Sequence, residues 1–203
     1  AGEDNFSANA CENDISVNLF QFISSNPNPH LNGTWVDVSN TGALTNNIYD
    51  ATVQGVGTYT FTYNVPSQNT CTMSTVTVEL TVHPLPTPAG VVEYEVCGLD
   101  EIANHTNVDL NSYISASSSN GYWSDNNGTN EINGTTDTII DIQNIFNNFG
   151  YGVYSFSRTA IPDHPICEFQ TFTVIIQIRR QLDFSNAVLE VESICENDVS
   201  GFP

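Results

Sequence analysis

The sequence contains no lysine and only 3 basic residues, against 23 acidic residues in 203 positions. The formal net charge is −20. A field of this sign repels phosphate backbones and anionic lipid, which argues against a nucleic-acid partner. A chain without lysine also cannot form the Lys–Asn isopeptide bonds that brace some surface domains, so cysteine is the only covalent brace left to it.

Long apolar runs and catalytic motifs are also missing. No stretch of 18 apolar residues is present, so we expect no membrane-spanning helix. No leader peptide is visible, as we expect of a mature or excerpted protein. The sequence has no nucleophile elbow, phosphate-binding loop or metalloprotease motif, and its histidines are scattered. We therefore predict that the protein is not an enzyme.

The residues that are plentiful favour β structure. Apolar residues make up 39% of the chain, including 11 Phe, 8 Tyr and 2 Trp, and the polar residues are rich in Thr, Asn and Ser. Aromatic and β-branched side chains fit a pleated sheet better than a helix. The composition predicts an all-β protein with enough apolar side chains to form cores.

One pattern of residues occurs twice and begins a third time. It consists of a cysteine, an apolar strand, Gly-x-Trp, Gly-x-Tyr-x-Phe, a second cysteine and an alternating strand. We call Cys11 and Cys97 the first-strand cysteines, and Cys71 and Cys167 the loop cysteines. Cys195 begins the third occurrence. A repeat of about 90 residues indicates an array of similar domains.

The repeat sets the predicted domain boundaries. Prolines are concentrated between the two full repeats and predict a stiff, extended linker. The second junction lacks proline, so the two joints are expected to differ in stiffness. The predicted segments are repeat one at 1–83, a linker at 84–87, repeat two at 88–180, and a linker with the start of an incomplete third repeat at 181–203.

Alternation of apolar and polar residues predicts a hairpin of strands at 58–65 and 75–82. Short strands with frequent turns favour tandem Ig-like antiparallel β-sandwich domains arranged end to end. Trp35 and Trp123 suit the core of such domains. Arg158 falls at the position of an apolar residue of repeat one, and we expect it at the rim of the sheet, since burying an unpaired guanidinium is costly.

Two smaller features carry expectations about local structure. The Gly-x-Tyr motif before each penultimate strand is similar to the corner tyrosine of Ig-like domains. The segment 139–150 is longer than its counterpart in repeat one, and we expect a short helix or an edge insertion there.

The cysteines are expected to pair within each repeat. In an Ig-like sandwich we expect the chain to enter at the end that also holds the last hairpin loop. This arrangement predicts disulfides Cys11–Cys71 and Cys97–Cys167, with the partner of Cys195 outside the chain. The rival pair Cys71–Cys97 would require the chain to double back over a strand and the linker. Disulfides imply an oxidising, extracytoplasmic setting.

Two weaker patterns predict a bound ion and a modification. Side-chain oxygens alternate around a glycine, as calcium prefers, at Asp125, Asn127, Thr129 and Glu131. A polar turn is the alternative explanation. The acids after each first-strand cysteine leave the same choice between calcium near a joint and turns held by Asx hydrogen bonds. The tripeptide at 137–139 fits a short O-glycosylation signal of Bacteroidetes, with Thr138 as the modified residue.

The full pattern resembles the Ig-like or PKD-like repeats of giant secreted Bacteroidetes surface proteins, among them the flavobacterial gliding-motility adhesins. The resemblance is carried by a first-strand cysteine, Gly-x-Trp, "GTYTFTYNV" at 57–65, a loop cysteine and "HPLPTP" at 83–88. It implies export through the type 9 secretion system, a location at the cell surface, and neighbouring repeats and motility or secretion machinery as partners.

The expected function is that of a structural stalk segment in a large cell-surface adhesin used for attachment and gliding. External surfaces or glycans are the expected targets of the whole protein, and calcium is the only cofactor expected. One alternative is an array of carbohydrate-binding modules, which an exposed aromatic strip would favour. Another is a filament subunit that donates a strand to its neighbour. Each repeat here contains its own final strand, which counts against this alternative.

Overall fold

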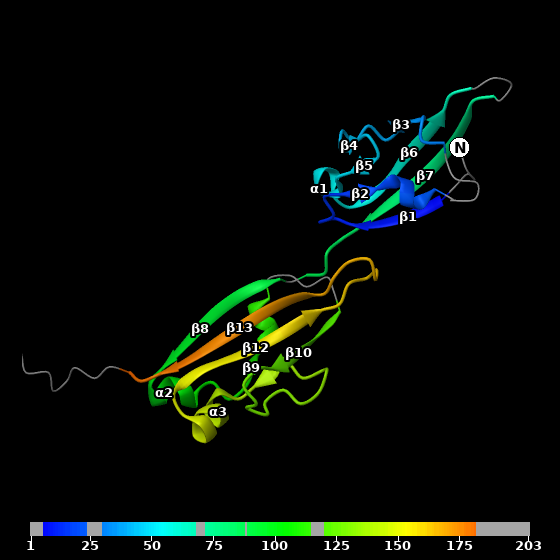
Figure 1. Cartoon of the computed structure of the whole chain (residues 1–203). Helices are drawn as coiled ribbons and strands as arrows, with labels where there is room; N and C mark the ends of the chain where they lie inside the picture. The colour runs from blue at the N-terminus through cyan, green and yellow to red at the C-terminus, as the bar shows by residue number, and fades with distance from the viewer. Residues whose placement is uncertain (1–5, 24–29, 68–71, 88, 115–119, 182–203) are drawn as a thin grey trace, which may run out of the picture.

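The computed structural model describes residues 6–23, 30–67, 72–87, 89–114 and 120–181. These residues form two β units that lie end to end, joined by a short linker (Figure 1). Each unit has its own hydrophobic core, and neither core contains a side chain of the other unit. Residues 182–203, where a third repeat is predicted to begin, lie outside the described part.

The first unit packs a four-stranded sheet against a smaller three-stranded one. The large sheet, in spatial order, consists of β1 (Phe6–Cys11), β7 (Ser74–His83), β6 (Gly57–Val65) and β3 (Thr34–Asp37). The small sheet consists of β2 (Val17–Asn18), β5 (Ile48–Tyr49) and β4 (Leu44–Thr45), with the short helices η1 (Leu19–Phe22) and α1 (Ala51–Gln54) beside it.

The second unit repeats this plan. Its four-stranded sheet consists of β10 (Gly121–Asp125), β12 (Gly152–Ala160), β13 (Gln170–Arg179) and β8 (Gly90–Cys97). Its second layer contains the pair β11 (Ile139–Ile140) and β9 (Val108–Asp109), with the helices α2 (Gly98–Ala103), η2 (Leu110–Tyr113) and α3 (Ile142–Phe149).

The predicted hairpin is confirmed as β6 and β7, which pair in antiparallel register. Alternate residues of both strands are buried, among them Phe61 and Val78, which lie opposite each other and are fully buried. The intervening threonines face outward. Period-two alternation therefore places one face of the sheet on the core and the other in water.

The sheets are mixed rather than purely antiparallel, which corrects one part of the sequence prediction. The first strand of each unit pairs in parallel with the last, as β1 does with β7 and β8 with β13. A parallel neighbour needs a long crossover connection, and the whole remainder of the unit lies between these two strands. The consequence is that the C-terminal ends of the first and last strands lie at the same end of the unit.

The predicted position of Arg158 at the rim is wrong. The residue lies inside β12, only 8% exposed, where Tyr63 stands in the first unit. Space for it comes from Gly121, because a Cβ at that position would lie 2.9 Å from Arg158 Cζ. Gly33 leaves the same space for the Tyr63 ring in the first unit, where the distance to Cζ is 2.5 Å. Burial lowers the pKa of Arg158.

The segment 139–150 forms the strand β11 and the helix α3, as the short-helix prediction expected. The first unit has the same helix in a shorter form, α1. Both helices are capped by an aspartate, since Asp50 accepts a hydrogen bond from Thr52 N and Asp141 accepts one from Asn144 N. Both end at a glycine with positive φ, Gly55 and Gly150. The longer segment of repeat two therefore extends an element that both repeats contain.

Candidate functional site: the joint between the units

A disulfide crosses the joint between the two units. Cys11, the last residue of β1, is bonded to Cys167 in the loop between β12 and β13, with a Cα–Cα distance of 5.1 Å. Both residues are buried, at 2% and 4% exposure. The bond links the first-strand cysteine of one unit to the loop cysteine of the next, over a sequence separation of 156 residues.

This bond overturns the predicted pairs Cys11–Cys71 and Cys97–Cys167. The prediction placed the first-strand cysteine at the same end of the sheet as the loop of its own last hairpin. Cys11 instead lies opposite His83, the last residue of β7, while the hairpin loop precedes Ser74 at the other end of that strand. A strand of 10 residues spans about 33 Å, whereas a disulfide needs Cα atoms within about 7 Å.

The remaining cysteines are placed differently. Cys97 is a free, half-buried thiol at the end of β8. Cys71 and Cys195 lie outside the described residues. The disulfide in the described residues joins two units, whereas the sequence predicted pairs within a unit, with Cys71–Cys97 as the rival.

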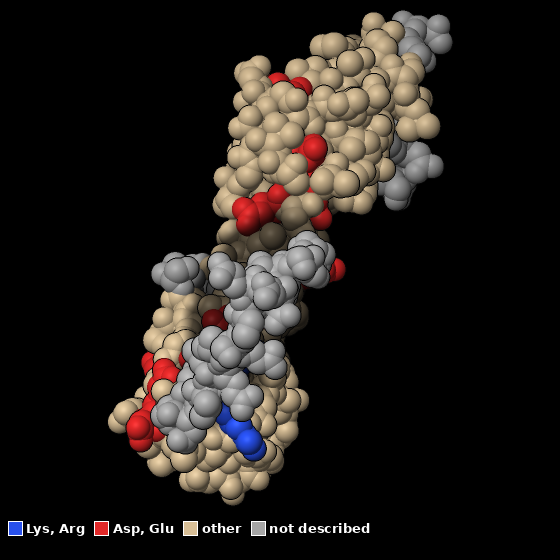
Figure 2. Space-filling view, turned by 90° about the vertical axis from the view of Figure 1, so that its left-hand side faces the viewer, with Lys and Arg blue, Asp and Glu red and all other residues tan. Residues whose placement is uncertain are grey.

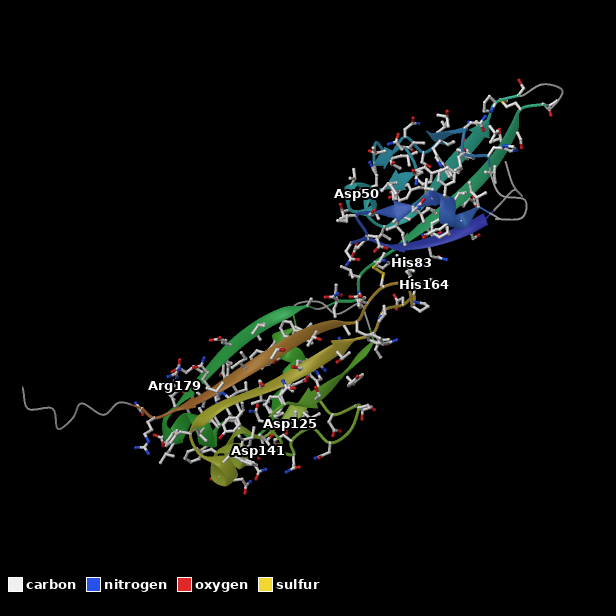
Figure 3. All side chains as sticks on the ribbon, in the orientation of Figure 1. Asp50, His83, Asp125, Asp141, His164 and Arg179 are labelled. Atoms are coloured by element: carbon white, nitrogen blue, oxygen red, sulfur yellow. A yellow bond between two sulfur atoms is a disulfide. The ribbon has the colours of Figure 1, made fainter. Side chains whose placement is uncertain are left out.

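Two histidines pack beside the disulfide. The His83 and His164 rings stack with centroids 4.0 Å apart and planes 7° apart, and Figure 3 shows them facing each other next to the yellow sulfur bond. His83 Nε2 donates to Asn9 Oδ1 at 2.8 Å. Burial, and secondarily the charge of His164, lowers the pKa of His83. The joint therefore favours the neutral form of His83.

The acids after Cys11 hold the chain that enters and leaves the joint. Asp14 Oδ2 accepts a hydrogen bond from Cys11 N at 2.8 Å. Glu12 Oε1 accepts one from Leu85 N in the linker, also at 2.8 Å. In the second unit Glu101 Oε2 accepts from Cys97 N at 2.6 Å. These bonds match the Asx-type alternative of the sequence prediction, since backbone N–H groups occupy the carboxylates.

The four residues predicted to bind calcium do not point to one centre. Asp125 accepts from Asn127 N, Thr129 Oγ1 and Asn130 N at 2.9, 2.8 and 2.8 Å. Asn127 Oδ1 accepts from Ser155 N on β12. Glu131 turns toward α3, where it accepts from Asp141 N and from the Asn144 side chain. The structure thus brings Asp125 and Thr129 together and separates Glu131 from them.

Across the described residues, no group of three or more His, Cys, Asp or Glu side chains is arranged to hold a metal ion. Calcium binding stays a prediction from the sequence. The side-chain oxygens of Asp125, Asn127 and Glu131 accept hydrogen bonds from protein donors, one of them the Thr129 hydroxyl, as the alternative of a polar turn requires.

The turn around Asp125 is shared by both units, which the sequence reasoning missed. Asp37 Oδ2 accepts from Thr41 Oγ1 at 2.7 Å and from Gly42 N at 3.0 Å, as Asp125 does from Thr129 and Asn130. The detectable signal is Trp-x-Asp-x-x-x-Thr, present in both repeats. Each threonine is buried and lies between two residues of positive φ, namely Asn40 and Gly42 in one unit and Gly128 and Asn130 in the other.

The predicted glycosylation residue Thr138 is half-buried, and its carbonyl oxygen accepts a hydrogen bond from Leu110 N at 2.8 Å. It directly precedes β11 on the second unit. Its modification stays a prediction from the sequence.

The two tryptophans pack against the cores, but in different ways. Trp123 is 3% exposed, and its Nε1 donates to Asn111 Oδ1 at 3.0 Å. Trp35 is half-buried and lines a cavity of about 440 Å³ together with Phe20, Asn46 and Asn47. Within the described residues, no acceptor meets Trp35 Nε1. Trp35 therefore presents part of its ring to this cavity, whereas its Nε1 is buried.

Charge is distributed unevenly between the units. All 3 basic residues, Arg158, Arg179 and Arg180, belong to the second unit. On the face shown in Figure 2, acidic atoms form several separate patches, and basic atoms form one small patch on the second unit. None of the helices in the described ranges is both long and apolar enough to cross a membrane.

Comparison with known proteins gives similarity of fold only. No family model matches the chain, and no curated protein matches it. Among solved structures, a Drosophila N-cadherin fragment (EC1-4) matches 88% of this chain and 48% of its own length, with 11% identity and a TM-score of 0.42. This chain thus spans about half of that fragment.

Two further solved structures show the range of these matches. Extracellular domains 3-5 of Drosophila OTK match 88% of this chain and 60% of their own length, at 13% identity and a TM-score of 0.39. A SusE-like, surface-located polysaccharide-binding protein of Bacteroides thetaiotaomicron matches 85% of this chain and 33% of its own, at 17% identity and a TM-score of 0.29. At these values the matches carry no argument about function.

Proposed function

We propose that this chain is a load-bearing stalk segment of a large secreted cell-surface protein, with adhesion as the role of the whole. The observation that carries the proposal is the covalent joint. A disulfide between adjacent units restricts how the units follow each other. It also supports an extracytoplasmic location, since disulfides persist in oxidising compartments.

The position of the bond determines where tension would run. A pull on the N-terminal side reaches Cys11, crosses to Cys167 and continues into β13. The 156 residues of separation between the two cysteines lie outside this path. Both hydrophobic cores draw most of their side chains from the bypassed segment, so tension would leave them largely unloaded.

Single-molecule force spectroscopy tests the proposal by pulling the chain from its two ends. Without reductant, we expect the segment between Cys11 and Cys167 to stay closed. With reductant, an additional contour length of about 560 Å should appear, taking 156 residues at about 3.6 Å each. Cys97→Ser is the matched control and should behave as the parent chain. Release of the full length without reductant would contradict a load-bearing joint.

A role in gliding and export through the type 9 system rests on the resemblance to repeats of flavobacterial adhesins, and the partners it implies are neighbouring repeats and surface machinery. The repeated corner tyrosines and the β-sandwich fold support membership in a repeat array. Replacement of this segment by an unrelated rigid spacer of equal length in the parent protein should preserve attachment if its function is that of a stalk.

Carbohydrate binding is the second candidate, and the Trp35 cavity is the observation that favours it. Trp35, Asn46 and Asn47 line this cavity, and aromatic and amide side chains are features of sugar-binding sites. A glycan array probed with the chain, with Trp35→Ala as the matched variant, decides between the two. Binding that the substitution removes would place carbohydrate binding ahead of the stalk, and we expect none.

A further inference from the structure

Cys97 occupies the position in the second unit that Cys11 occupies in the first. Each is the last residue of its unit's first strand, and each lies opposite the final residue of the last strand, His83 for Cys11 and Arg179 for Cys97. The backbone N–H of each donates to a nearby downstream carboxylate. The two cysteines thus lie at the same position of equivalent strands, in the same register and with an equivalent backbone hydrogen bond.

Equivalence extends to the end of the unit at which each cysteine lies. The ends of β1 and β7 lie at the joint with the second unit (Figure 1). The ends of β8 and β13, with α2 beside them, lie at the opposite end of the second unit, and Figure 3 labels Arg179 there. A unit that followed the second as the second follows the first would therefore meet Cys97.

The surroundings of Cys97 leave room for such a partner. The thiol is half-buried at a cavity of about 760 Å³, lined by Glu95, Tyr151, Ile178 and Arg179 among others. Its Sγ donates to Glu95 Oε1 at 3.4 Å, and Glu95 pairs with Arg179 at 3.0 Å. Burial, and then the bond to Glu95, raises the pKa of Cys97 and keeps it a thiol. At the first joint the equivalent sulfur is covered by the loop that carries Cys167.

We propose that Cys97 forms a second disulfide between units, with the loop cysteine of a following repeat of this same fold as its partner. The inference deepens the proposed stalk function, on which it rests only in requiring that another unit follows. In the reaction the two thiols join through one S–S bond. Two electrons and two protons pass to a disulfide oxidant such as oxidised glutathione, which is released as two reduced thiols.

An extended chain tests this directly. In this extended chain, a copy of residues 84–181 is joined directly after Arg179. Arg179 is equivalent to His83, after which the linker to the second unit begins. The appended unit therefore follows the second unit as the second follows the first. Cys71→Ser removes one thiol from exchange throughout. Ile166→Val, at an exposed position of the appended copy, gives its loop peptide a distinct mass. The protein is refolded in a glutathione redox buffer and mapped by mass spectrometry without reduction.

We expect the original Cys97 to be joined to the appended copy's Cys167, and only the appended copy's Cys97 to remain a thiol. Cys97→Ser in the original copy is the control, and it should leave the appended loop cysteine free. Formation of Cys11–Cys167 in the same molecules reports correct folding. If that bond forms while the original Cys97 stays reduced or joins another cysteine, the inference fails. The force measurement on the first joint would still stand and test the stalk separately.

Discussion

At the scale of single residues, a tyrosine fixes the corner before the penultimate strand of each unit. The Tyr59 hydroxyl donates to Gly55 O at 3.1 Å, and the Tyr154 hydroxyl donates to Gly150 O at 3.0 Å. Both acceptors are glycines with positive φ that end a helix. The sequence pattern Gly-x-Tyr predicted this corner, and the hydrogen bonds confirm it.

Loss of either corner hydroxyl should destabilise its unit. Tyr59→Phe and Tyr154→Phe keep the ring and leave a carbonyl without its donor, which costs about 1–2 kcal/mol of unfolding free energy. Tyr122→Phe is the matched control, because Tyr122 is 40% exposed. Urea unfolding of the three variants measures the difference. Equal stability of all three would show that water replaces the corner bond at no cost.

The aspartate of the Trp-x-Asp turn should matter more. Asp125→Ala removes an acceptor for three hydrogen bonds, one of them from a buried threonine, and we expect a loss of about 2–3 kcal/mol. Asp163→Ala, at an exposed loop position, should have little effect. Thermal unfolding in millimolar calcium and in chelator tests the calcium prediction separately, and equal melting temperatures in the two conditions would contradict it. A melting temperature that rises with calcium in the parent and not in Asp125→Ala would support the calcium prediction instead.

At the scale of elements, the joint is built by the ends of β1 and β7 and by the β12–β13 loop. Together these elements place Cys11, Cys167, His83 and His164 within one contact region. The Glu12 carboxylate ties the linker to the same region through Leu85 N. In the described part of the chain, the joint thus contains a covalent bond, a ring stack and a backbone anchor.

The histidine stack should make the joint sensitive to mild acid. The pKa of His83 in the folded protein lies below the ordinary value of about 6.5, so the unfolded chain takes up a proton first as the pH falls. Stability is therefore complete above about pH 6.5 and falls as the pH drops toward the lowered pKa. Urea unfolding between pH 7.5 and 5.5 measures the slope.

His164→Gln is the informative variant for this pH dependence. It removes the neighbouring charge that helps to lower the pKa of His83 and leaves the burial of His83 in place. The loss of stability between pH 7.5 and 5.5 should become smaller. An unchanged slope would show that His164 contributes nothing to the pH dependence and would leave the burial of His83 as its cause.

At the scale of the whole molecule, two units with separate cores are held together by few groups. The Cys11–Cys167 bond closes a loop of 156 residues, which in the chain-entropy model is worth about 5 kcal/mol if the enclosed chain unfolds as one. Because each unit has its own core, we expect the bond to act mainly on the arrangement of the units rather than on either fold.

The variant Cys11→Ser with Cys167→Ser separates these two effects. Circular dichroism should show both units folded, because their cores contain side chains from one unit each. Small-angle scattering should show a broader distribution of maximum dimensions than in the parent chain. Scattering profiles that coincide would mean that the stack and the linker hold the joint without the disulfide.

The sequence by itself determined the β class, the repeat and the strands of the last hairpin. Alternation along β6 and β7 depends only on which residues face the core, and this is a local property of the chain. The corner tyrosines were also readable, because the carbonyl that each hydroxyl meets lies four residues away.

Only the tertiary structure decided the direction of the first strand, and with it the partner of Cys11. Alternating residues look the same in parallel and antiparallel pairs, so the pattern of β1 does not show at which end of the sheet Cys11 lies. Parallel pairing with β7 carries Cys11 to the joint and away from the hairpin loop of its own unit. The burial of Arg158 was decided in the same way, because the space it fills comes from Gly121 on a neighbouring strand.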